Sequence, residues 1–135
     1  MRVTGQCHCK QIAYEAEVDP AMAAICHCTD CQVLSGSPYR VVIPTKQLTF
    51  TKGQPKIYIK TTADSGRPRA QAFCADCGTP IFASAPEPGS EGPYMLRTGA
   101  IKERVQLQPR KAIWCESAIS WAENIADVPK TAKQS

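Results

Sequence analysis

Closely spaced cysteines are the residues of this sequence best suited to chemistry. They stand in the segments GQCHCKQ, ICHCTDCQ and FCADCGTPIF, and one further cysteine, Cys115, stands apart. Sulfurs spaced as C-x-C or C-x-x-C can reach one ion together and are typical zinc ligands. Because no signal-peptide pattern follows Met1, we expect a reducing, cytoplasmic setting, which favours metal binding over disulfides.

Two of the segments together supply four ligands. Alternate residues of an extended chain point to the same face, so the sulfurs of Cys7 and Cys9 lie together and the histidine between them points away. Cys74 and Cys77 form a C-x-x-C pair, and the following Gly78 permits the tight backbone of a zinc knuckle. A thioredoxin-type redox pair is the alternative, but the sequence lacks its βαβ setting. We therefore predict a structural zinc ion bound by these four cysteines.

The remaining segment supplies three ligands, Cys26, Cys28 and Cys31. Three protein ligands and one open position are typical of a catalytic zinc ion, and the open position takes water, a thiol or a carbonyl. Cys115 could fill that position, although its setting, AIWCES, favours apolar packing beside Trp114. A histidine of either C-H-C segment becomes a ligand only if the backbone turns sharply. The sequence thus predicts two zinc ions per chain, one structural and one catalytic.

One short helix is needed to place Cys31. Thr29 is a good N-cap, Gln32 stands three residues later as a capping-box partner, and Gly36 can end the helix in a left-handed conformation. The pattern predicts a helix over residues 30–35 with Cys31 in its first turn, where the helix dipole favours a thiolate. A polar turn with a buried cysteine is the alternative.

The other predicted elements are strands. Stretches of β-branched and aromatic residues separated by turn-forming residues predict strands over residues 10–18, 39–45, 56–62, 80–85 and 93–101. Residues 62–70 and 85–93 are rich in Gly, Pro and Ser and are predicted to be loops. This spacing is typical of a mainly β sandwich or barrel, not of a parallel α/β protein. In a chain of 135 residues, we expect a single domain over residues 1–126 and a flexible polar tail over residues 127–135.

Charge and hydropathy count against two classes of partner. The formal charge of +4 falls to about +1 when seven cysteines bind two zinc ions as thiolates. The basic residues are scattered and form no run of the kind found in nucleic-acid-binding arms. The longest apolar stretch is far shorter than the roughly 20 residues that span a bilayer. We therefore expect neither a nucleic acid nor a membrane as partner.

The order of these motifs resembles a known family. The motifs G-x-C-x-C, C-H-C-x-x-C-Q-x-x-S-G, F-C-x-x-C-G-T-P and I-W-x-x-S-x-x-x-W follow one another from about Gly5 to Trp121. This order resembles the glutathione-dependent formaldehyde-activating enzyme family, also called the centromere-protein-V-like family. The resemblance implies a zinc-stapled β-tent of mainly antiparallel sheets. It also implies a structural zinc ion at Cys7, Cys9, Cys74 and Cys77 and a catalytic zinc ion at Cys26, Cys28 and Cys31.

The resemblance also implies an activity. The implied activity is that of a carbon–sulfur lyase of the S-(hydroxymethyl)glutathione synthase type, which joins a small thiol such as glutathione to a small aldehyde such as formaldehyde. Arg67 and Arg69, just before the C-x-x-C pair, could pair with the carboxylates of glutathione, although solvated loop arginines are common. The alternative is a non-catalytic zinc-binding interaction module, since some relatives are named for chromatin association. A near-neutral charge after metal binding counts against nucleic acid as its partner.

Overall fold

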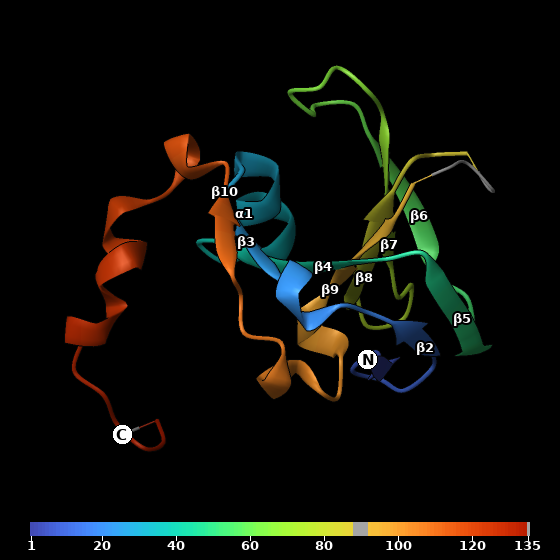
Figure 1. Cartoon of the computed structure of the whole chain (residues 1–135), viewed down its shortest axis with the longest axis horizontal. Helices are drawn as coiled ribbons and strands as arrows, with labels where there is room; N and C mark the ends of the chain where they lie inside the picture. Colours follow the sequence, from blue (N-terminus) through green and yellow to red (C-terminus); the bar gives the residue numbers. More distant parts are fainter. Residues whose placement is uncertain (88–91, 135) are drawn as a thin grey trace.

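Two β-sheets make up most of the structure, a computed structural model that describes residues 1–87 and 92–134. The smaller sheet has the strand order β1-β2-β5, and the larger has the order β10-β3-β4-β9-β8-β7-β6 (Figure 1). The strands are β1 (Arg2–Gln6), β2 (Ala13–Glu17), β3 (Ala24–Cys26), β4 (Arg40–Thr45), β5 (Gln47–Lys52), β6 (Lys56–Lys60), β7 (Arg69–Phe73), β8 (Pro80–Ser84), β9 (Tyr94–Arg97) and β10 (Lys111–Ile113). The mainly β prediction is confirmed. The described strands pair antiparallel, except that β10 runs parallel to β3.

Five of these strands lie within the five predicted ranges, namely β2, β4, β6, β8 and β9. The other strands were not predicted, because they are short or mix small and polar residues, as in the β1 sequence RVTGQ. The predicted loop over residues 62–70 is wrong at its end, since β7 begins at Arg69. The predicted loop over residues 85–93 lies partly outside the described residues.

The helices are short. One α-helix, α1 (Thr29–Ser35), follows β3, as predicted for the segment after the C-H-C-x-x-C motif. The 3₁₀ helices are Pro20–Met22, Thr98–Ala100, Arg104–Gln106, Cys115–Ser117 and Ser120–Asp127. The last two lie to the side of β10, away from the smaller sheet (Figure 1). Within the described ranges, no helix has the length and apolar character needed to cross a membrane.

The two ends of α1 test the capping prediction. Gly36 ends the helix in the left-handed region at φ 68°, as predicted. The predicted N-cap is wrong, because Cys28 and not Thr29 caps the helix, with its sulfur accepting the Cys31 N–H at 3.2 Å. The side chain of Gln32 is not a capping-box partner either. Its amide donates instead to the carbonyls of His27 and Ser117, at 2.9 and 3.0 Å, and so joins α1 to the C-terminal segment.

The larger sheet has two different faces. Ile43, Phe82 and Leu96 are buried and belong to the core cluster that also contains Val3 and Tyr14 of the smaller sheet. Because side chains alternate along a strand, the residues next to these core residues point to the opposite face. That opposite face carries Cys26 of β3 and the residues opposite or beside it in the sheet, which form the site described next.

Candidate metal centres

The four cysteines predicted to bind one zinc ion come together. The sulfurs of Cys7, Cys9, Cys74 and Cys77 all lie within 4.8 Å of one another. The Cys7 and Cys9 sulfurs are 3.6 Å apart, and the Cys9 and Cys74 sulfurs are 3.7 Å apart. A tetrahedral zinc ion with bonds to sulfur of about 2.3 Å holds its sulfurs about 3.8 Å apart. The cluster therefore fits a four-coordinate metal ion.

The backbone around this cluster has the form of a knuckle. Gly78 has φ 79°, and its N–H donates to the Cys74 carbonyl at 2.8 Å. This conformation is easy for glycine and strained for other residues. Thr79 continues the turn, and its hydroxyl lies 3.1 Å from the Cys77 sulfur. This hydrogen bond, together with bonds from the backbone of Thr79 and Cys9, lowers the pKa of Cys77 to about 5. A thiol that ionises this readily is suited to binding a metal ion as a thiolate.

The second cluster contains the three predicted cysteines. The sulfurs of Cys26, Cys28 and Cys31 lie within 4.8 Å of one another, and no other His, Cys, Asp or Glu of residues 1–87 and 92–134 joins the group. Cys115 is exposed at the start of a 3₁₀ helix and is outside both clusters as described. The prediction that Cys115 is buried in apolar packing beside Trp114 is therefore wrong.

Hydrogen bonds within the second cluster shift the pKa values of its thiols in different directions. The hydrogen bond with Cys31 lowers the pKa of Cys26, and the same bond, together with burial, raises the pKa of Cys31. Cys31 does lie in the first turn of α1, as predicted, but Cys26 at the end of β3 is the thiol that ionises first. The backbone N–H of Cys31 donates to the Cys28 sulfur, a contact typical of zinc-bound thiolates.

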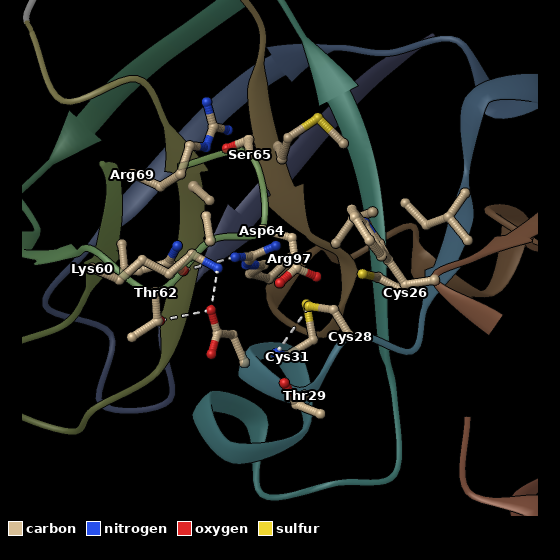
Figure 2. A pocket seen from close by; sticks show the side chains of 18 residues that line it. Cys26, Cys28, Thr29, Cys31, Lys60, Thr62, Asp64, Ser65, Arg69 and Arg97 are labelled. Atoms are coloured by element: carbon tan, nitrogen blue, oxygen red, sulfur yellow. Dashed lines mark hydrogen bonds and ion pairs between the residues drawn. The ribbon is translucent and has the colours of Figure 1, made fainter. Parts of the chain in front are cut away.

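The three sulfurs lie at one side of a cavity of about 250 Å³ (Figure 2). Its floor is the free face of the larger sheet, and its walls come from α1, the segment after β6 and the end of β10. The lining residues are Cys26, Cys28, Thr29, Asp30, Cys31, Val42, Lys60, Thr62, Ala63, Asp64, Ser65, Arg69, Gln71, Ala83, Met95, Arg97, Ile113 and Trp114. Trp114 adopts a left-handed backbone at φ 58°, and its side chain forms part of this wall. A small molecule can therefore reach the three-cysteine cluster.

The histidines of the two C-H-C segments are not part of the clusters, as predicted. The predicted reason is wrong, because the C-H-C segments are not extended strands: His8 and Cys9 lie in a turn after β1, and β3 ends at Cys26. His27 is buried and packs edge-on against Tyr39, with ring centres 5.6 Å apart. The backbone N–H of His27 donates to the Ile113 carbonyl at 3.0 Å, which fixes β10 beside the cluster. His8 is exposed.

A polar contact holds one wall of the cavity in place. The Lys60 ammonium donates to the Asp30 carboxylate at 2.8 Å, and the Thr62 hydroxyl donates to the same oxygen at 2.9 Å. The Lys60 hydrogen bond lowers the pKa of Asp30. These bonds join α1 to the end of β6, where the chain continues into the lining residues Asp64 and Ser65.

The structure separates the two arginines singled out in the sequence. Arg69 is half-buried and lines the cavity, whereas Arg67 is exposed and is not among the lining residues. Sequence reasoning missed Arg97, which is buried and lines the cavity, and Arg40, which stands opposite Cys26 in the sheet. No local motif marks either residue. Only the alternation along β4, once paired with β3, could have indicated Arg40.

Comparisons with known proteins found a matching family model and a solved structure of similar fold. Residues 2–117 match the family model described as glutathione-dependent formaldehyde-activating enzyme. Among solved structures, a crystal structure of a Rhodobacter sphaeroides protein is similar in fold, with a TM-score of 0.59 and 17% sequence identity. The similarity covers 81% of this chain and 98% of that chain. No curated protein matches this sequence significantly.

Proposed function

The chain belongs to the glutathione-dependent formaldehyde-activating enzyme family, and we propose that it is a zinc-dependent carbon–sulfur lyase acting on the adduct of a small thiol and a small aldehyde. Glutathione and formaldehyde are the proposed pair, and S-hydroxymethylglutathione is their product. We also propose that each chain carries two zinc ions, one structural and one catalytic.

The difference between the two clusters carries this proposal. The four-cysteine cluster has a complete ligand set, whereas the three-cysteine cluster has one ligand fewer and faces a cavity. An incomplete ligand set beside a cavity is the arrangement that lets a metal ion bind a substrate. We therefore assign the structural zinc ion to Cys7, Cys9, Cys74 and Cys77 and the catalytic zinc ion to Cys26, Cys28 and Cys31.

The proposed reaction is an addition without redox change. The thiol sulfur forms a bond to the aldehyde carbon, one pair of electrons of the carbon–oxygen double bond moves to oxygen, and the oxygen takes up the proton that the thiol releases. Zinc at the three cysteines would supply a Lewis-acid position that holds the thiol as a thiolate. Bringing thiol and aldehyde together in one cavity removes much of the entropic barrier to their reaction.

Residues of the cavity account for the binding of a charged thiol. Arg69 is our candidate for pairing with a carboxylate of glutathione, because it lines the cavity and a guanidinium can bind a carboxylate with two hydrogen bonds. Arg67, exposed on the same loop, remains a second candidate. The Trp114 and Ile113 side chains provide an apolar wall that limits access of water to the reacting atoms.

Consumption of formaldehyde tests the proposal. The zinc-loaded protein should speed the loss of free formaldehyde in excess glutathione above the spontaneous rate, and Cys31→Ser should return the rate to the spontaneous one. Cys115→Ser is the matched control, because Cys115 is exposed and outside both clusters as described. It should keep full activity. No acceleration by the zinc-loaded protein with glutathione or another small thiol would favour the alternative of a non-catalytic interaction module.

A further inference from the structure

Two buried arginines lie beside the three-cysteine cluster. Arg40 stands opposite Cys26 in the β3–β4 pair, and Arg97 stands opposite Val42 in the β4–β9 pair. Opposite residues share one face of a sheet, so both arginines lie on the face that carries Cys26. Their exposed fractions are 7% and 8%, and neither forms an ion pair with a carboxylate in the described part of the chain.

Both guanidinium groups are incompletely hydrogen bonded. Nη2 of Arg97 donates to the Gln71 side-chain oxygen at 2.8 Å, but its Nε has no partner among the described residues, and neither does Nη2 of Arg40. Buried cations without counter-charges destabilise a fold. Burial and the nearby Arg40 lower the pKa of Arg97 to about 10, so it stays charged at neutral pH.

The cysteine sulfurs are the counter-charges of these arginines. Burial lowers the pKa of Arg40, and the charges of Cys31, Cys28 and Cys26 act in the opposite direction. The same cysteines act on Arg97 in the same way. Figure 2 shows Arg97 in the cavity, between Cys28 and Cys31 on one side and Lys60 on the other. Arg97 therefore adds its positive charge to the cavity beside the three cysteines, whereas Arg40 does not line that cavity and adds its charge from behind, through its place opposite Cys26 in the sheet.

A count of charges indicates what that ligand is. Three thiolates and one zinc ion leave one net negative charge, and the two arginines turn this into one net positive charge. The charged side chains that line the cavity besides Arg97 cancel in number, Lys60 against Asp30 and Arg69 against Asp64. A fourth ligand with one negative charge makes the site neutral. A neutral ligand leaves an unbalanced positive charge in a mostly buried place, which is unfavourable.

We propose that Arg40 and Arg97 make the open position of the three-cysteine site selective for an anionic ligand, so that a thiol binds there as its thiolate in preference to a neutral carbonyl or water. The inference rests on the proposed function only in requiring that Cys26, Cys28 and Cys31 hold the metal ion. Both arginines are positioning residues that act through charge. At an effective dielectric constant of about 20, one such charge changes affinity on the order of tenfold or more. Thiolate capture, not carbonyl polarisation, is then the task of the site.

Ligand binding to the cobalt-substituted protein tests this selectivity. Cobalt(II) replaces zinc in thiolate sites, and its absorption spectrum changes when a further ligand binds. The probes are 2-mercaptoethanol, which binds as an anion, and imidazole, which binds as a neutral molecule. Arg97→Met and Arg40→Met should each weaken 2-mercaptoethanol binding about tenfold and leave imidazole binding unchanged or tighter. Arg97→Lys should keep most of the preference, because it keeps the charge.

A control variant and melting temperatures distinguish a loss of affinity caused by the lost charge from one caused by misfolding. Arg110→Met removes an exposed arginine and should leave both affinities unchanged. Melting temperatures of the Met variants are measured beside their affinities, because removing one partner of a buried charge pair can also lower stability, and a uniform loss of stability would weaken both probes alike. If one Met variant does not fold, the other and Arg97→Lys still give the comparison.

Two results would overturn the inference. One is an equal loss of affinity for both probes, which would indicate a role in shape alone, and the other is no change for either. Failure of the proposed function looks different, because the wild-type protein would then show no spectral change with either probe. An active enzyme whose arginine variants keep the thiolate preference would refute the charge argument alone.

Discussion

Gly5 shows how one residue without a side chain shapes the protein. It stands opposite Tyr14 in the β1–β2 pair, and the Tyr14 ring lies where the Cβ of any other residue would be. Tyr14 is almost completely buried in the core cluster. The close approach of ring and backbone therefore requires glycine at this position, two residues before Cys7 of the first metal cluster.

We expect Gly5→Ala to destabilise the protein by about 2 kcal/mol or more, because the added methyl group overlaps a fully packed ring. The loss should appear as a lower midpoint in urea at equal zinc content. Gly99→Ala is the matched control, since no atom lies within 4 Å of its added Cβ. Equal midpoints for the two variants would contradict the packing argument.

At the scale of elements, α1 and β6 are joined by few bonds. Asp30 of α1 accepts from Lys60 at the end of β6 and from Thr62 just beyond it. β6 is an edge strand, so on its outer side it has no strand neighbour within the described sheet. The contact therefore matters for the position of residues 62–65, which line the cavity.

We expect Asp30→Asn to lower stability by less than about 1 kcal/mol, because the ion pair is partly exposed. Since Lys60 lowers the pKa of Asp30 in the folded protein, its contribution is present above the unfolded value of about 4 and disappears as the pH falls through the lowered pKa. Urea midpoints of wild type and variant should therefore differ at neutral pH and converge in acid.

The control for this pH series is Asp127→Asn, because Asp127 is exposed. This variant should follow the wild type at every pH. A difference between wild type and Asp30→Asn that persists in acid would show that the carboxylate charge is not what joins α1 to β6. The Asp30→Asn variant should also bind the thiol substrate less tightly, since the wall at residues 62–65 loses its support.

At the scale of the whole molecule, one cluster connects the two sheets, whereas the other lies within a single segment of the chain. Cys7 and Cys9 follow β1 of the smaller sheet, whereas Cys74 and Cys77 follow β7 of the larger sheet. A metal ion at this cluster closes a long loop and connects the two sheets. The three-cysteine cluster lies within one short segment, so its metal ion restrains much less of the chain.

We therefore expect Cys74→Ser and Cys31→Ser to fail in different ways. Cys74→Ser should give insoluble or thermally labile protein, with a loss of several kcal/mol, because structural zinc contributes directly to folding. Cys31→Ser should stay folded, retain one zinc ion per chain instead of two, and lose thiol-dependent activity. Melting curves and zinc content measured by plasma emission give both results.

If Cys74→Ser and Cys31→Ser destabilised the protein equally, the three-cysteine cluster would be structural too. Its zinc ion would then not be the catalytic one, and the proposed enzyme would lose its main support. Cys115→Ser, outside both clusters as described, serves as the control and should match the wild type in stability and in zinc content.

Local spacing was enough to predict much of this protein. The C-x-C and C-x-x-C motifs point to seven candidate metal ligands, because sulfurs two or three residues apart are brought together by the backbone itself. The end of α1 at Gly36 and the strands with clear β-branched patterns follow from the same short-range rules. The grouping of four and three ligands followed from counting what zinc needs, and the structure confirms that these sulfurs lie together.

The surroundings of the ligands were decided only by the tertiary structure. Arg40 lies beside Cys26 because β3 pairs with β4, Arg97 joins them because β9 pairs with β4, and Lys60 reaches Asp30 from the far edge of the same sheet. Such neighbours come from strand pairing between distant segments, whose register depends on the packing of the whole core. The sequence by itself therefore determined which residues can bind metal, and the sheet determined which charges surround them.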